Sequence, residues 1–201
     1  MGELKDTIGP HTVHLCIDMQ RLFTGGGPWA MPWMERVTPK VVLLVERAPQ
    51  RVIFTRFIPP LDAGEVPGKW RAYYTKWSGV TRRHIDNRLI DLLPVLRRYA
   101  PPATIFDKTF YSAFADGQLH RHLAASKIDA PIVSGSETDV CVLSSTLAAV
   151  DHGYRVIIAE DAVCSSSDES HDALLDLFNR RFDVQIECAK AEQILEAWRV
   201  S

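Results

Sequence analysis

The chain has 201 residues, 46% of them hydrophobic, and its formal net charge is -2 at pH 7. This length suits one packed domain over residues 1–201, and the weak charge excludes a broad attraction to nucleic acid or to an anionic membrane, which favours a small-molecule partner. Four cysteines without CxxC spacing, and no apolar run that resembles a leader or a membrane span, predict a soluble protein of the reducing cytoplasm.

Short apolar runs rich in β-branched residues alternate along the chain with longer segments of helical period. This alternation predicts an α/β fold in which helices cover both faces of a parallel sheet. The first helix is expected to begin with Thr38 as its N-cap and Pro39 in its first turn. We expect a doubly wound sheet with strand order 3-2-1-4-5-6. The expected strands are 12–18, 51–57, 104–108, 130–134, 154–159 and 184–188, and the later helices are 118–126, 140–152, 168–179 and 191–199.

Residues 59–87 form one long segment that is predicted to be irregular. An insertion of this size in a compact domain is usually a lid or an interface element. Its stretch GKWRAYYTKW mixes aromatic and basic residues, a combination that can also stack on single-stranded bases. We favour burial of these aromatic side chains at a subunit interface or at the mouth of a pocket. The side chains concerned are Trp70, Tyr73, Tyr74 and Trp77.

Polar residues stand at the carboxyl ends of the expected strands, where doubly wound sheets bind ligands. Asp18 ends the first strand, Arg56 lies near the end of the second, and Lys108 ends the third. Cys141 lies in the first turn of the helix that follows the fourth strand. The expected strand order therefore places Asp18 and Cys141 on either side of the switch point, with Lys108 within reach.

An acid, a cation and a thiol in one place suit nucleophilic chemistry. A helix N-terminus next to a cation lowers the pKa of a thiol from its usual value of about 8.5. Asp18 is expected to accept the thiol proton and later donate it, while Lys108 keeps Asp18 ionised and stabilises the thiolate. Backbone N–H groups in the preceding turn are available for an oxyanion. The remaining cysteines are interpreted as structural: Cys16, Cys164 and Cys188.

Three segments, CIDMQRLF, FDKTFYSAF and SGSETDVCV, also carry a resemblance. Together and in this order they resemble the signature segments of the isochorismatase-like cysteine hydrolases, a superfamily that includes nicotinamidase and N-carbamoylsarcosine amidase. The resemblance implies a catalytic triad of Asp18, Lys108 and Cys141. It also implies a non-proline cis peptide between Ser136 and Glu137, with the backbone N–H groups of Glu137 and Cys141 forming an oxyanion hole.

The resemblance narrows the substrate in two ways. Nicotinamidases hold a metal with an Asp-x-His pair after the second strand, where this chain reads FTRFIPP, so we expect no metal and no cofactor. Isochorismatases proper cleave a vinyl ether and typically lack the cysteine, so Cys141 favours attack on an amide, carbamoyl or imide carbon. Arg56 is expected to pair with a substrate carboxylate. The pocket is expected to include Phe23, Trp77 and Tyr111.

The leading hypothesis is a metal-independent cysteine amidohydrolase that acts on a small C–N substrate (amide, carbamoyl or ureido compound). One alternative is an isochorismatase-type ether or ester hydrolase that uses Asp18 as its acid. Another is a catalytically idle relative that serves as a subunit or binding partner, and a nucleotide-binding module is a weaker option. In relatives the segment corresponding to 59–87 often packs on a neighbouring subunit, so we expect a homo-oligomer, either a dimer or a tetramer.

Overall fold

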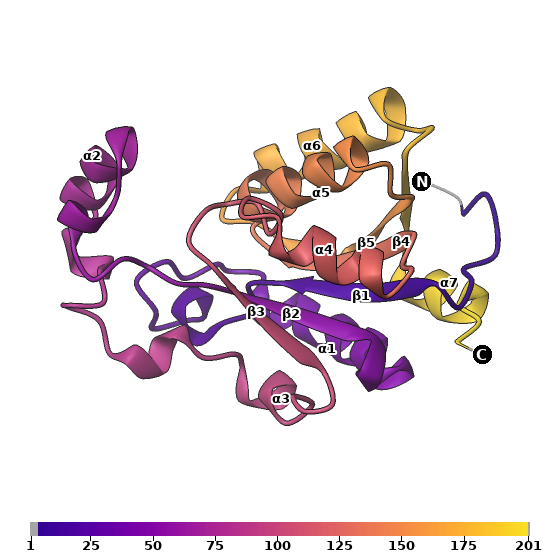
Figure 1. Cartoon of the computed structure of the whole chain (residues 1–201), viewed down its shortest axis with the longest axis horizontal. Coiled ribbons are helices and arrows are strands. Elements are labelled where there is room, and N and C mark those ends of the chain that lie inside the picture. Colours follow the sequence, from indigo (N-terminus) through magenta and orange to yellow (C-terminus); the bar gives the residue numbers. More distant parts are fainter. Residues whose placement is uncertain (1–3, 201) are drawn as a thin grey trace.

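A computed structural model describes residues 4–200, and within them six parallel strands form one sheet in the order β3-β2-β1-β4-β5-β6 (Figure 1). The expected α/β fold class, strand number and strand order are therefore confirmed. The strands are β1 (Thr12–Ile17), β2 (Val52–Phe57), β3 (Thr104–Lys108), β4 (Ala130–Ser136), β5 (Val156–Cys164) and β6 (Ile186–Ala189).

Helices cover both faces of this sheet, so its central strands β1 and β4 are buried throughout. Along β1 the side chains of Val13, Leu15 and Ile17 pack against α4, α5 and α6, whereas Cys16 belongs to the core under α1, α3 and α7 (Figure 1). This alternation follows from the period of two in a β-strand. The helices are α1 (Met34–Arg47), α2 (Gly68–Lys76), α3 (Pro94–Arg97), α4 (Gln118–Ala125), α5 (Leu143–Asp151), α6 (Asp168–Arg181) and α7 (Ala191–Ala197). Within residues 4–200 no helix combines the length and apolar character that a membrane crossing requires.

The predicted start of the first helix was wrong. Helix α1 begins at Met34, and Thr38 lies inside it, where its hydroxyl donates to the Met34 carbonyl oxygen at 2.6 Å. Pro39 falls in the second turn of α1 and removes one backbone hydrogen-bond donor. The helix is stable despite this loss because the apolar residues on one of its faces are buried. The combination of Thr and Pro therefore marks the helix interior here and not its N-terminus.

Strands β4 and β5 run farther than expected. The apolar run of β5 is interrupted by Glu160 and Asp161, which are half-buried, and the strand then continues to Cys164. The register with β4 shifts between Val133 and Gly135, so β5 contains extra, unpaired residues at this point before pairing resumes. Such a bulge has no signature in hydrophobic periodicity.

The segment 59–87 is more regular than expected, because it contains α2 and two short 3-10 turns, Ala63–Glu65 and Ser78–Val80. Figure 1 shows α2 standing apart from the layered sheet and helices. Tyr74 is 1% exposed and stacks on Trp70 at 6.2 Å between ring centroids. Tyr74 is thus buried within its own chain, and its expected place at an interface or pocket mouth was wrong.

Candidate active site

Asp18, Lys108 and Cys141 meet at the carboxyl edge of the sheet. The Lys108 Nζ atom lies 2.7 Å from Asp18 Oδ2 and 3.4 Å from Cys141 Sγ. All three residues are buried, with exposed fractions of 0%, 7% and 6% in chain order. The structure therefore brings together the three residues that the strand ends indicated.

The sheet order explains this convergence. Asp18 follows β1, Cys141 follows the adjacent β4, and Lys108 ends β3, from which its long side chain reaches past β2. Strand β4 approaches β1 closely at Gly135, where a Cβ atom would lie 2.0 Å from the Ile17 carbonyl oxygen. Gly135 has a φ of +106°, a conformation that only glycine adopts readily. The close approach of β4 to β1, which brings Cys141 near Asp18, therefore requires glycine at position 135.

The groups that orient Asp18 have no signature in the sequence. The Thr55 hydroxyl donates to Asp18 Oδ1 at 2.6 Å and accepts from the Asp18 backbone N–H at 3.1 Å. The Ser136 hydroxyl donates to the Asp18 carbonyl oxygen at 3.0 Å. These contacts hold a residue whose φ of 47° is uncommon for an aspartate. Because Thr55 reads as an ordinary β-strand residue, nothing in the sequence distinguished it.

The electrostatics of the thiol differ from the expectation. Burial raises the pKa of Cys141, the Asp18 carboxylate raises it further, and the Lys108 ammonium opposes both. The expected lowering of the thiol pKa was therefore wrong for the free protein. Burial lowers the pKa of Lys108, but Asp18 and Cys141, which face it, raise that pKa by more. The pKa of Lys108 is therefore above the usual value for a lysine. At rest the site consists of a neutral thiol beside an Asp–Lys ion pair.

The turn after β4 has the backbone geometry that the resemblance implied. The peptide bond between Ser136 and Glu137 is cis, which confirms that expectation. A π-helical turn, Thr138–Val142, follows directly, and the Val142 N–H donates to the Glu137 carbonyl oxygen at 3.0 Å. Among residues 4–200 no acceptor forms a hydrogen bond with the Glu137 N–H, so this donor is available to a ligand. The oxyanion-hole role of the Glu137 and Cys141 N–H groups stays a prediction.

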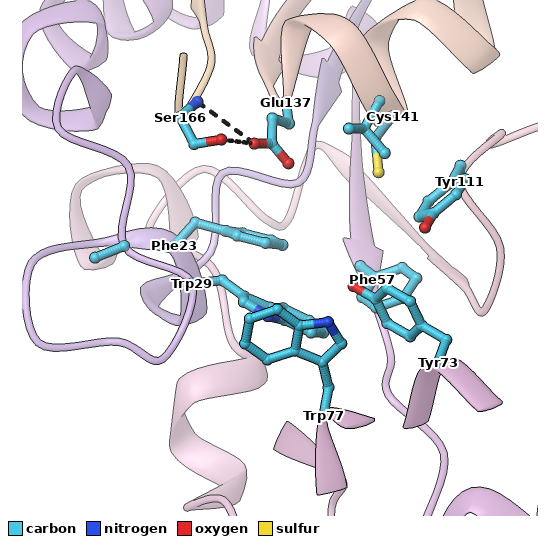
Figure 2. A pocket seen from close by; sticks show the side chains of 11 residues that line it. Phe23, Trp29, Phe57, Tyr73, Trp77, Tyr111, Glu137, Cys141 and Ser166 are labelled. Atoms are coloured by element: carbon cyan, nitrogen blue, oxygen red, sulfur yellow. Dashed lines mark hydrogen bonds between the residues drawn. The ribbon is translucent and has the colours of Figure 1, made fainter. Parts of the chain in front are cut away.

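A cavity of about 430 Å³ opens above the thiol (Figure 2). Phe23, Trp77 and Tyr111 line it, in agreement with their expected place at the pocket. Trp29 and Phe57 also line the cavity. Neither was predicted from the sequence, since each lies in a segment without a recognisable motif. The remaining lining residues are Ala30, Tyr73, Glu137, Val140, Cys141 and Ser166.

Arg56 does not belong to this cavity, so its expected role as a carboxylate ligand was wrong. Its Nε and a terminal nitrogen donate to the two carboxylate oxygens of Asp107 at 2.8 and 2.9 Å, and Asp91 lies 3.4 Å away. Arg56 and Asp107 are direct cross-strand partners. Because neighbouring strand residues point to opposite faces, Phe57 faces the cavity in place of Arg56.

No group of three or more His, Cys, Asp or Glu side chains in the described part of the chain is placed to hold a metal ion. The expectation that the protein needs no metal and no cofactor stays a prediction.

Comparison with known proteins identifies the class. A model of the isochorismatase domain matches residues 12–190, and the chain belongs to the isochorismatase family. The "Uncharacterized isochorismatase family protein PncA" of Bacillus subtilis (strain 168) is 31% identical over 97 residues, which are 47% of this chain and 53% of that protein, so the match spans about half of that relative. Nicotinamidase 3 of Arabidopsis thaliana is 28% identical over 183 residues, which are 90% of this chain and 87% of that protein.

The fold has solved counterparts as well. A cysteine hydrolase from Pseudomonas syringae pv. phaseolicola 1448A has a TM-score of 0.84 at 23% identity, covering 98% of this chain and 96% of that one. This similarity shows a shared fold. Family and relatives together indicate an isochorismatase-family hydrolase.

Proposed function

We propose that the protein is a cysteine amidohydrolase that cleaves a small amide, carbamoyl or ureido compound without a metal. The observation that carries this proposal is the buried group of Asp18, Lys108 and Cys141, of which Cys141 lines the cavity, with Lys108 Nζ 2.7 Å from the carboxylate and 3.4 Å from the sulfur. A nucleophile, a proton carrier and a fixed cation are the parts that acyl transfer requires.

The first half of the reaction forms an acyl-enzyme. Asp18 takes the thiol proton as Cys141 Sγ adds to the substrate carbonyl carbon, and the carbonyl electrons move to the oxygen. The Glu137 and Cys141 N–H groups stabilise this oxyanion. Collapse of the intermediate breaks the C–N bond, and the departing nitrogen takes the proton from Asp18. The products of this half are ammonia or an amine and a thioester on Cys141.

The second half returns the enzyme to its resting state. Asp18 removes a proton from a water molecule that adds to the thioester carbonyl. Collapse then breaks the C–S bond, and the sulfur of Cys141 recovers its proton from Asp18. The released product is a carboxylic or carbamic acid.

The raised pKa of Cys141 gives Asp18 and Lys108 separate tasks. A raised pKa favours the neutral thiol, so in the proposed reaction the proton moves from Cys141 during the attack. Asp18 is the acceptor, and Thr55 holds its other oxygen. Lys108 lies close to both atoms that exchange the proton, so it stabilises negative charge on either of them.

Nicotinamide is a poor candidate for the substrate. The segment FTRFIPP, where nicotinamidases are expected to hold a metal, has instead an arginine at the end of β2 that is already paired with Asp107 and Asp91. The cavity above Cys141 is instead bounded mostly by aromatic rings. We therefore propose a substrate that is recognised by these rings and not through a metal ion.

The test is ammonia or amine release from a panel of small amides, ureido acids and carbamoyl amines, after removal of metals by chelation. Hydrolysis that survives chelation and is abolished in Cys141→Ala supports the proposal. Cys188→Ala is the matched control, since Cys188 is equally buried but lies in β6, away from the cavity. Hydrolysis of an ether or ester that persists in Cys141→Ala and is lost in Asp18→Asn would instead support an acid-catalysed reaction.

A further inference from the structure

The charge of the cavity wall is unbalanced. Glu137 is the one carboxylate side chain among the lining residues, and none of them is a lysine or an arginine. Two cations lie next to lining rings: Lys108, which is paired with Asp18 at 2.7 Å and lies 5.0 Å from the Phe57 ring centroid, and Lys76, which lies 5.6 Å from the Trp77 ring centroid. Among the lining residues that the structure describes, a ligand therefore meets one carboxylate and no cationic side chain.

Aromatic rings form the opposite wall. Trp29 lies at their centre, with ring centroids 6.1 Å from Phe23, 6.1 Å from Phe57, 6.4 Å from Tyr73 and 6.4 Å from Trp77. Figure 2 shows these rings facing the side of the cavity that carries Glu137 and Cys141. The negative face of an aromatic ring attracts cations, and indole does so most strongly.

The Glu137 carboxylate is held in place while one oxygen stays free. Both the hydroxyl and the backbone N–H of Ser166 donate to Oε1, the latter at 3.4 Å, and Oε2 has no recorded partner within residues 4–200. Glu137 lies in the turn that carries Cys141, so a group bound to its carboxylate is close to the nucleophile.

We propose that the cavity selects substrates in which a cationic group, a protonated amine or a quaternary ammonium, is attached near the scissile C–N group. The cation lies between Glu137 and the rings around Trp29, and the carbonyl lies over Cys141. This inference rests on the proposed function and specifies its substrate class. This inference reverses the expectation that Arg56 binds a substrate carboxylate. An anionic substrate is repelled by the Glu137 carboxylate, and Arg56 is already paired with Asp107.

Binding to the Cys141→Ala variant tests this selection separately from catalysis. Three primary amides of similar size serve as probes: trimethylammonioacetamide, the isosteric neutral 3,3-dimethylbutanamide, and the anion of succinamic acid. Calorimetry is expected to show the cation binding about tenfold more tightly than its neutral isostere, with the anion weakest. A homologue of the cation with a longer methylene chain locates the preferred distance between charge and carbonyl.

Two further substitutions, made in the same Cys141→Ala background, assign the selectivity to named groups. Glu137→Gln keeps an acceptor for Ser166 but removes the charge, so it is expected to weaken cation binding about tenfold and leave the neutral isostere unchanged. Trp77→Leu removes a ring that is 38% exposed, so the core is spared, and the cation is expected to lose more affinity than the isostere. Asp176→Asn, on the exposed face of α6, controls for overall charge and is expected to alter neither.

Equal or tighter binding of the neutral isostere would overturn the inference, as would equal losses for both probes in Glu137→Gln. Failure of every cationic amide to bind at millimolar concentration would overturn it too. None of these results depends on turnover. If the cation binds selectively but the native enzyme does not hydrolyse it, the binding inference stands and the proposed reaction fails.

Discussion

Lys108 and Asp18 form an ion pair of 2.7 Å, with side chains that are 6% and 0% exposed. A buried pair of this kind does not add much stability compared with an apolar pair, but loss of one partner leaves an uncompensated buried charge. The pair therefore constrains which variants can fold, and in the proposed mechanism it also serves the chemistry of Cys141.

Replacement of Lys108 separates these two roles. Lys108→Met is expected to cost about 3–5 kcal/mol in the free energy of unfolding, because it leaves Asp18 unpaired. Adding Asp18→Asn is expected to recover most of this stability while hydrolysis stays absent. Urea denaturation of the two variants checks this, and a double variant no more stable than Lys108→Met would show that the lysine acts on the fold in another way.

Thr55 is predicted to be a positioning residue for Asp18. Thr55→Val keeps the shape of the side chain but removes the hydroxyl that bonds the carboxylate at 2.6 Å. A lost hydrogen bond to a charged group amounts to about 1.5–3 kcal/mol, so kcat is expected to fall by about tenfold or more with little change in KM. Thr55→Ser should restore most of kcat. If both variants lost the same activity, packing of the Thr55 methyl group would be the cause.

Alkylation of Cys141 is predicted to respond to Asp18 in the opposite direction from hydrolysis. The Asp18 carboxylate raises the pKa of the thiol, so Asp18→Asn lowers that pKa and increases the thiolate fraction at a given pH. Iodoacetamide should therefore label Cys141 faster in this variant, although hydrolysis is lost. Peptide mapping by mass spectrometry measures the rate. Cys16 serves as the internal reference, since burial raises its pKa to about 12.

His14 is predicted to limit stability in acid. It is fully buried, its Nε2 atom lies 2.7 Å from Ser134 Oγ, and burial lowers its pKa from 6.5 to about 3. Between these values the unfolded chain binds a proton that the folded chain does not, so stability falls as the pH drops, by up to about 1.4 kcal/mol per pH unit. Thermal melting from neutral pH to pH 4 checks this. His14→Gln should flatten that part of the profile, and an unchanged slope would assign it to other groups.

The surface around the segment that carries α2 is predicted to form contacts between subunits. Three large apolar side chains of the chain are more than a third exposed near it: Leu61, Trp77 and Phe110. We predict a homo-oligomer, a dimer or a tetramer, in which this surface is covered. Light scattering measures the mass in solution, and Leu61→Lys is expected to shift it toward the monomer. A monomeric native protein would contradict this prediction.

The proposed catalytic residues could be singled out from the sequence because they follow from strand ends. Asp18 and Lys108 stand at strand ends and Cys141 stands in the turn that follows a strand, and parallel strands bring such positions to one edge. The groups that support them could not, because they depend on register. Thr55 reaches Asp18 since β1 and β2 pair as they do, and no local pattern encodes that pairing.

The pocket wall was predictable only in part, for a related reason. Arg56 and Phe57 are adjacent, and the phase of the strand pleat decides which of the two faces the cavity. The choice is coupled to Asp107, which is distant in sequence and binds Arg56 across the strands. Trp29 lies in a loop, where its position depends on the rings around it and not on any periodic pattern.

The most direct test of the central claim is the intact mass of the enzyme after acid quenching during turnover of a substrate found in the amide panel. The account predicts an adduct equal to the acyl group, the substrate without its departing amine, that maps to Cys141. Lys108 and Asp18 variants should not form it. Turnover without any adduct, together with hydrolysis that persists in Cys141→Ala, would contradict nucleophilic catalysis by this thiol.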